Sequence, residues 1–206
     1  MLIRTVLWDA DGVLQRVPRG AEESMRPAVE GLVDDMEGFL REALREERPA
    51  LAGQVRWLDV LPGLLERWGI ADSYDTVVNA WLTLEEVPGA HAIVRGLRAA
   101  GTRCCLATNQ DERRAAYMRD TFGYDGWLDD TFFSCELGAA KPDPAYFEAV
   151  LARLDDPPER VLFVDDNAAN VAAARGVGLV AEEWSYREGL DALRALLARH
   201  GLAVAA

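Results

Sequence analysis

The stretch Trp8-Asp9-Ala10-Asp11-Gly12-Val13 decides the fold of this 206-residue chain. It follows Leu2-Ile3-Arg4-Thr5-Val6-Leu7, an apolar run with β-branched residues that predicts a buried strand. Asp9 and Asp11 therefore stand where a strand ends, and Gly12 allows the backbone to turn sharply there. In open α/β sheets, ligands bind at the carboxyl ends of the strands. The stretch thus predicts a sheet with a polar site at its edge.

The use of lysine points to a second position of interest. The chain holds one lysine, Lys141, against 21 arginines, and this lysine lies in Gly138-Ala139-Ala140-Lys141-Pro142-Asp143-Pro144. Lysine carries a compact point charge, whereas the guanidinium of arginine is broad and planar. The exception suggests that a compact ammonium is required at Lys141.

Composition excludes several classes of partner. A formal net charge of −13 argues against nucleic acid and anionic membranes, which both attract basic surfaces. The chain has no apolar run as long as a membrane span and opens with no basic and apolar leader. Three cysteines without metal-binding spacing fit a reducing compartment, so we expect a cytoplasmic protein: Cys104, Cys105 and Cys135.

The second half of the chain alternates between two kinds of pattern. Helices are predicted over residues 92–100, 112–122, 145–154, 168–175 and 186–200, and strands over 102–107, 130–134, 160–164 and 179–181. Strands that alternate with helices predict βαβ units. We therefore expect an α/β fold with a Rossmann-like parallel sheet and helices on both faces.

Residues 15–87 have a different character. They are rich in Glu, Arg, Leu and Ala, and their periodicity predicts helices over 26–45, 55–68 and 74–84. The simplest organisation is a sheet domain formed by residues 1–14 and 88–206, interrupted by a small all-helical domain over 15–87.

Polar residues follow several strands of the predicted sheet, and parallel strands bring such loops to one edge. These residues are Asp9, Asp11, Thr108, Asn109, Lys141, Asp165 and Asp166. Two like charges about 4 Å apart repel by ~4 kcal/mol at an effective dielectric constant near 20, so a cation is expected among the carboxylates. An all-oxygen ligand set suits Mg²⁺. Zinc is disfavoured because His91 and His200 lie far from this set in the sequence.

Each of these pieces has an ordinary structural reading when taken alone. Asp-x-Asp is common in solvated turns, Thr108 could cap the helix that follows, and Lys141 could lie at the surface. Asp165 and Asp166 could simply begin a helix. Their combination, in this order along the chain, favours chemistry.

The motifs resemble those of the haloacid dehalogenase superfamily, in its phosphatase branch. The similarity lies in Asp9-Ala10-Asp11-Gly12-Val13, Leu106-Ala107-Thr108-Asn109, Lys141-Pro142-Asp143-Pro144 and Val164-Asp165-Asp166-Asn167. The helical insertion stands where this family has a cap domain of the C1 type. Asn170 departs from the pattern, because many phosphatases of the family have a further Asp there.

The resemblance implies a role for each of these residues. Asp9 would be the nucleophile that forms an aspartyl phosphate, and Asp11 would protonate the leaving group and later deprotonate water. Mg²⁺ would be held by Asp9, the Asp11 carbonyl, Asp166 and, through water, Asp165. The phosphate would be bound by Thr108, Asn109, Lys141 and the backbone near Gly12. The resemblance implies a small phosphorylated substrate, and the chain would be a monomer or a homodimer.

Other functions stay open at this point. Within the superfamily, the alternatives are a 2-haloacid dehalogenase, which Asp11 disfavours, and a phosphomutase, which the absence of His and Lys from residues 15–87 disfavours. A phospho-accepting signalling domain or a non-catalytic binding protein are further alternatives. Arg16 and Arg19 could reach an anionic substrate, although a solvated loop is the simpler expectation.

Overall fold

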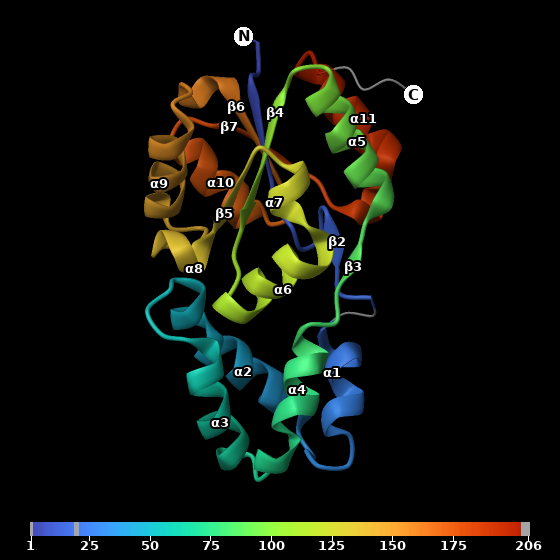
Figure 1. The fold of residues 1–206 in the computed structure, drawn as a ribbon, viewed down its shortest axis with the longest axis vertical. Helices are drawn as coiled ribbons and strands as arrows, with labels where there is room; N and C mark the ends of the chain where they lie inside the picture. Colours follow the sequence, from blue (N-terminus) through green and yellow to red (C-terminus); the bar gives the residue numbers. More distant parts are fainter. Residues whose placement is uncertain (1, 19–20, 203–206) are drawn as a thin grey trace.

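The computed structural model describes residues 2–18 and 21–202, so Arg19 lies outside the described residues. The first domain contains a five-stranded sheet in the order β5-β4-β1-β6-β7, and each neighbouring pair of strands is parallel. Its strands are β1 (Thr5–Trp8), β4 (Arg103–Thr108), β5 (Asp130–Phe133), β6 (Val161–Asp165) and β7 (Val180–Glu183). Figure 1 shows β1 near the middle of this sheet. The predicted α/β class with a parallel, Rossmann-like sheet is confirmed.

Helices cover both faces of the sheet, as the alternating pattern predicted. The helices of this domain are α5 (Pro88–Ala99), α6 (Glu112–Phe122), α7 (Tyr124–Trp127), α8 (Ser134–Leu137), α9 (Pro144–Leu154), α10 (Ala168–Gly176) and α11 (Leu190–Arg199), with 3₁₀ turns η2 (Pro158–Arg160) and η3 (Tyr186–Glu188). Successive side chains of a strand point to opposite faces. Accordingly, Val6 and Trp8 pack in the cluster with α5 and α11, whereas Leu7 packs in the cluster with α9 and α10.

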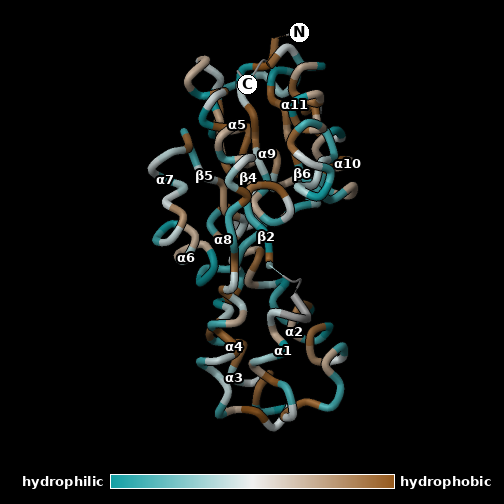
Figure 2. The backbone as a smooth tube through the Cα atoms, turned by 90° about the vertical axis from the view of Figure 1, so that its right-hand side faces the viewer, coloured by the Kyte–Doolittle hydropathy of each residue, from teal (hydrophilic) through white to brown (hydrophobic). Residues whose placement is uncertain are grey.

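The inserted segment forms a helical cap with a hydrophobic core of its own. It contains α1 (Ala21–Val29), α2 (Met36–Leu51), α3 (Trp57–Arg67), η1 (Ala71–Ser73) and α4 (Tyr74–Trp81). Phe39, Trp57 and Leu64 are buried in its core. Figure 2 shows the cap helices gathered at one end of the molecule, next to β2. The domain boundaries at residues 14/15 and 87/88 stay a prediction.

A short antiparallel ribbon joins the cap to the sheet domain. Strand β2 (Gln15–Arg16) pairs with β3 (Glu85–Glu86), so the chain enters and leaves the cap side by side. A second connection comes from α6: the Glu112 carboxylate accepts the backbone N–H of Trp57 at 2.9 Å. This contact caps the N-terminus of α3, where the residue at the cap position, Arg56, makes no side-chain capping bond. The cap is thus seated on the sheet domain at α6.

Several helices predicted from the sequence begin or end at other residues in the structure, including the one predicted over 92–100, which begins at Pro88, and the one predicted over 74–84, which ends at Trp81. The single helix predicted over residues 26–45 is wrong, because the chain breaks between α1 and α2. Gly31 has a left-handed φ of +75°, and the Asp35 side chain accepts the Gly38 N–H at 2.8 Å to start α2. The helix predicted over 186–200 begins at Leu190, because Gly189 adopts a φ of +84°.

Candidate active site

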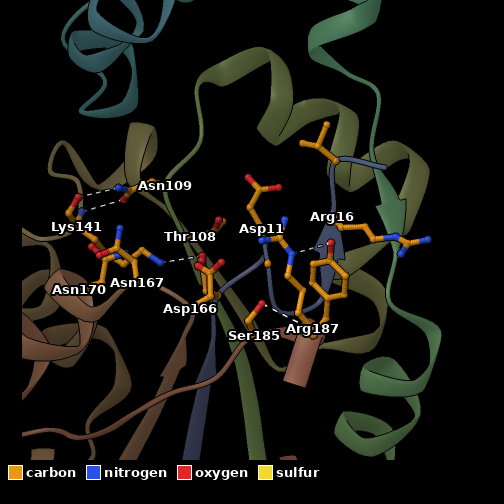
Figure 3. A pocket seen from close by; sticks show the side chains of 14 residues that line it. Asp11, Arg16, Thr108, Asn109, Lys141, Asp166, Asn167, Asn170, Ser185 and Arg187 are labelled. Atoms are coloured by element: carbon orange, nitrogen blue, oxygen red, sulfur yellow. Dashed lines mark hydrogen bonds and ion pairs between the residues drawn. The ribbon is translucent and has the colours of Figure 1, made fainter. Parts of the chain in front are cut away.

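A pocket opens at the carboxyl ends of β1, β4 and β6, where the sheet meets the cap. It is lined by Asp9, Asp11, Gly12, Arg16, Val17, Thr108, Asn109, Lys141, Asp166, Asn167, Asn170, Ser185, Tyr186 and Arg187. Trp8 of β1 lies in register with Leu106 of β4 and Val164 of β6, so the residues that follow these three strands meet. Figure 3 shows their side chains converging on one cavity.

The Lys141 ammonium joins two carboxylates beneath the pocket. Its Nζ donates to Asp9 Oδ1 at 2.8 Å and to Asp165 Oδ2 at 2.7 Å, and it also donates to the Ala107 carbonyl at 2.8 Å. The Lys141 side chain is 1% exposed. An ammonium has three hydrogens, and here each has an acceptor. Lys141 is therefore a fixed, buried counter-charge in this arrangement.

Local bonds hold the Lys141 loop in place. The Asn109 side chain donates to the Lys141 carbonyl at 2.7 Å and accepts the Lys141 N–H at 2.8 Å. Asp143 accepts the Ala145 N–H and Pro144 is the first residue of α9, a pair that starts a helix directly after the loop. The Asn109 side chain is thus committed to the backbone of Lys141.

The two neighbouring aspartates after β6 differ in their surroundings. Asp165 is fully buried, and its oxygens accept from Lys141, from the Asn167 N–H at 2.8 Å and from Asn170 Nδ2 at 3.1 Å. Asp166 is exposed to the pocket and lies against Gly12. A Cβ at Gly12 would stand 2.0 Å from Asp166 Oδ2, and Gly12 has a φ of +83°. Glycine is therefore required at this position.

The carboxylate cluster carries more negative charge than Lys141 balances. Carboxylate oxygens of Asp9, Asp165 and Asp166 all lie within 4.8 Å of one another. Burial raises the pKa of Asp9, and the charge of Asp165 adds to this rise while Lys141 opposes it. Burial and the charge of Asp165 also raise the pKa of Asp166. Burial would lower the pKa of Lys141, but the charges of Asp9 and Asp165 outweigh it and raise that pKa.

These oxygens match the ligands of a hard divalent cation. The three carboxylates come from two strand ends, and their repulsion would be relieved by a positive ion between them. Asp166 faces the pocket, which leaves room for water and a ligand beside it. The chemistry of the donor set and its excess charge therefore fit Mg²⁺.

Asp11 is turned away from this carboxylate cluster. Its oxygens accept two bonds from Arg114 Nη2, both 2.9 Å, one from Gln110 Nε2 at 2.9 Å and one from Gln15 Nε2 at 3.0 Å. Gln110 also donates to Thr108 Oγ1 at 3.1 Å. Gln15, Gln110 and Arg114 were not predicted from the sequence. Gln110 precedes α6 and Arg114 lies in its first turn, so no regular spacing in the sequence indicated that they would meet at Asp11.

The structure thus brings the predicted site residues to one pocket and its floor, but the Asp11 carboxylate lies apart from the other carboxylates. Asp9, Asp165 and Asp166 form the acidic cluster, whereas the Asp11 carboxylate belongs to a separate group around Arg114. Asn170, the departure from the motif, donates to both oxygens of Asp165. An Asp at this position would instead add another negative charge next to Asp165.

Solved structures with a similar fold include a haloacid dehalogenase family enzyme. A haloacid dehalogenase family enzyme from Bacteroides thetaiotaomicron superposes with a TM-score of 0.80 at 22% identity, over 94% of this chain and 98% of that one. The same enzyme has been solved with magnesium and inorganic phosphate, and that structure superposes with a TM-score of 0.75 at 21% identity. These likenesses concern the fold.

Sequence comparison gives the family itself. The family model described as haloacid dehalogenase-like hydrolase matches residues 3–178, so the chain belongs to this family. A phosphorylated carbohydrates phosphatase from Thermotoga maritima is 26% identical over 86% of this chain and 82% of its own length. A phosphoglycolate phosphatase from Pseudomonas putida is 29% identical over 73% of this chain, which spans 60% of that relative.

Proposed function

We propose that this haloacid dehalogenase-like hydrolase is a Mg²⁺-dependent phosphatase that cleaves a small phosphorylated metabolite through an aspartyl phosphate on Asp9. The bridge from Lys141 to Asp9 and Asp165, with Asp166 beside it, is the observation that carries the proposal. The phosphatase names of two relatives support it. The chain has a formal net charge of −13, which repels anions, so a positive side chain at the site favours the binding of a phosphate.

The nucleophile in this proposal is one particular oxygen of Asp9. Lys141 holds Oδ1, so we assign the attack on phosphorus to Oδ2. The P–O bond to the leaving alcohol breaks as the bond to Asp9 forms, and water then cleaves the acyl phosphate to regenerate the carboxylate. A fixed carboxylate favours this step, because phosphoryl transfer depends chiefly on positioning and charge stabilisation.

Asp9 and Asp166 are the proposed direct side-chain ligands of Mg²⁺. The oxygens of Asp165 already accept from Lys141, Asn167 and Asn170, so Asp165 orients the lysine and would reach the metal through water. The Asp11 carbonyl completes the protein ligands in this proposal. Burial raises the pKa of Asp9 and the charge of Asp165 adds to this rise; when bound, Mg²⁺ would offset that charge and would polarise the phosphoryl oxygens.

The remaining residues would bind the phosphoryl group and move a proton. Thr108 and the backbone N–H groups near Gly12 and Asn109 are the proposed phosphate donors, since the Asn109 side chain is already bonded to Lys141. Lys141 contributes its charge, because its three hydrogens have acceptors. Asp11 would give a proton to the leaving alkoxide and take one from water.

The outer wall of the pocket suggests what the leaving group carries. Arg16 and Arg187 lie on the side away from Lys141 and Asn109 (Figure 3), and their guanidinium carbons stand 5.6 and 5.7 Å from the ring centre of Tyr186. We propose that these arginines favour leaving groups with a negative or strongly polar substituent. We further propose a cytoplasmic location, in keeping with three unpaired cysteines.

Phosphate release from a panel of phosphomonoesters tests the proposal. Wild-type protein with Mg²⁺ is expected to release phosphate, and Asp9→Asn is expected to lower the rate on the order of 10⁴-fold or more. A melting temperature close to that of the wild type is the control for folding. Full activity of Asp9→Asn, or activity unaffected by a chelator, would refute the mechanism.

A further inference from the structure

The Asp11 carboxylate accepts hydrogen bonds from side chains that, within the described part of the chain, make no hydrogen bond to the other site carboxylates. Arg114 contacts both Asp11 oxygens, while Gln110 and Gln15 each contact one of them. Gln15 is itself oriented by Tyr124, whose hydroxyl donates to Gln15 Oε1 at 3.1 Å. This orientation directs the Gln15 amide nitrogen toward Asp11. The Asp11 carboxylate therefore has a defined position that the surrounding side chains impose.

Arg114 connects this carboxylate to the cap. Its side chain is 12% exposed and rises from α6 of the sheet domain. A small cavity between the domains is lined by Arg114 together with Glu47 of α2 and Trp81 of α4. Glu47 is 6% exposed and accepts the indole N–H of Trp81 at 3.2 Å. The same guanidinium thus faces the proposed acid on one side and a buried carboxyl of the cap on the other.

The bonds of this group are incomplete, which argues against a purely structural role. The Nε of Arg114 is buried without a hydrogen-bond partner among the described residues, whereas the Asp111 side chain interacts with the Glu47 carboxyl. Asp111 also begins α6, accepting the N–H groups of Arg113 and Arg114 through Oδ1. Buried polar groups are normally paired, so an unpaired donor beside a catalytic group needs an explanation. A guanidinium fixed by its contact with Asp11 provides one.

We propose that Arg114 is a positioning residue that orients the Asp11 carboxylate for proton transfer. We also propose that Glu47 makes this orientation depend on the contact between the cap and the sheet domain. The inference rests on the proposed phosphatase function. A proton donor matters most when the leaving group is a poor one, because an alkoxide must be protonated as it departs. A phenolate that carries a nitro group leaves without this help. Leaving-group dependence therefore isolates the proposed role.

The experiment compares p-nitrophenyl phosphate with an alkyl phosphate such as glycerol phosphate. Arg114→Met is expected to lower kcat/KM, which reports only the steps up to transfer of the phosphoryl group to Asp9, by about 10–100-fold for the alkyl ester and by less than about 3-fold for the nitrophenyl ester. Arg114→Lys keeps the charge but loses the two-oxygen contact, so it should recover part of the alkyl-ester activity. Arg113→Met, the neighbouring arginine on α6, is the matched control and should behave like the wild type.

A second set of variants tests the coupling to Asp11 and to the cap. Asp11→Asn should show the same selective loss in kcat/KM, and adding Arg114→Met to it should cause no further loss in that quantity. Glu47→Ala should reproduce the selective loss at a smaller size, whereas Glu47→Gln should retain activity. If Arg114→Met does not fold, the selectivity of Arg114→Lys for the alkyl ester decides the question.

Two results would overturn the inference while leaving the proposed function intact. One is an equal loss on both esters in the Arg114 variants, which would indicate a structural role. The other is an additive loss in the double variant, which would separate Arg114 from Asp11. Failure of the phosphatase proposal looks different, because the wild type would then release phosphate from neither ester.

Discussion

Two cations bind carboxylates that follow β1, and they are held in different ways. Lys141 has an acceptor for each of its three hydrogens, and all of these acceptors lie on the sheet domain. Arg114 faces Asp11 on the sheet domain and Glu47 on the cap, and its Nε has no hydrogen-bond partner among the described residues. The contacts of Lys141 therefore stay within the sheet domain, whereas Arg114 also lines a cavity with Glu47 of the cap. The comparison separates a part of the site built within the sheet domain from a part that contacts the cap.

Removal of the lysine charge should have the largest effect. Lys141→Met leaves Asp9 and Asp165 facing each other without a cation, and breaking a buried ion pair in this way costs about 3–5 kcal/mol. We expect phosphatase activity to disappear and the free energy of unfolding in urea to fall by that amount. Lys141→Arg is the matched variant, and it should also fail because a guanidinium cannot replace a 1%-exposed ammonium. Unchanged stability of Lys141→Met would contradict the account of a fixed cluster.

Metal binding should stabilise the part of the site built within the sheet domain. Mg²⁺ at 100 times its Kd is expected to add about 2.7 kcal/mol to the free energy of unfolding, because it relieves repulsion among the carboxylates. Asp166→Asn and Gly12→Ala should lose this increment, the latter because its Cβ would displace Asp166. Asp191→Asn, which removes an exposed carboxylate on α11, should keep it. An equal thermal shift in all four proteins would argue against the assigned ligands.

The part that contacts the cap should respond to pH through Glu47. Burial, with the charge of Asp111 adding to it, raises the pKa of Glu47 from 4.5 to about 8. A protonated Glu47 therefore stabilises the folded state fully below about pH 4.5. This stabilisation is lost as the pH rises to about 8, by about 1.4 kcal/mol for each pH unit between the two values. Glu47→Gln stays neutral, so the wild type should lose stability relative to it between pH 5 and pH 8. A constant difference across this range in denaturant titrations would disprove the raised pKa.

The smallest effect is expected at the rim of the pocket. Arg187→Gln should raise KM about 5-fold for phosphomonoesters that carry a second anionic group, which corresponds to about 1 kcal/mol. Esters with a neutral leaving group should be unaffected, as should Arg194→Gln, which removes an exposed arginine from α11. Equal effects on anionic and neutral substrates would show that Arg187 does not contact the leaving group.

The difference between the two clusters also explains how far the sequence could predict the structure. Asp9, Thr108 and Asp165 end or follow strands, and a parallel sheet brings such positions together whatever the details of packing. Lys141 stood out as the only lysine. For these residues, local sequence pattern and topology were sufficient.

The contacts between the site and the cap could not be predicted from the sequence in the same way. Glu47 stands in the charged run Arg45-Glu46-Glu47-Arg48, which looks solvent-exposed, yet it continues the buried stripe of Phe39 and Ala43 on α2. Its burial depends on how the cap sits against α6, a long-range contact without a local signal. The break between α1 and α2 was missed because helical periodicity continued across Gly31 and Asp35.

Acid quenching of the enzyme during turnover with Mg²⁺, followed by mass spectrometry of its peptides, tests the central claim most directly. We expect the added mass of one phosphoryl group on the peptide that contains Asp9, and its absence from Asp9→Asn. Steady release of phosphate with no phosphorylated peptide at any quench time, or with the group on another residue, would contradict the claim.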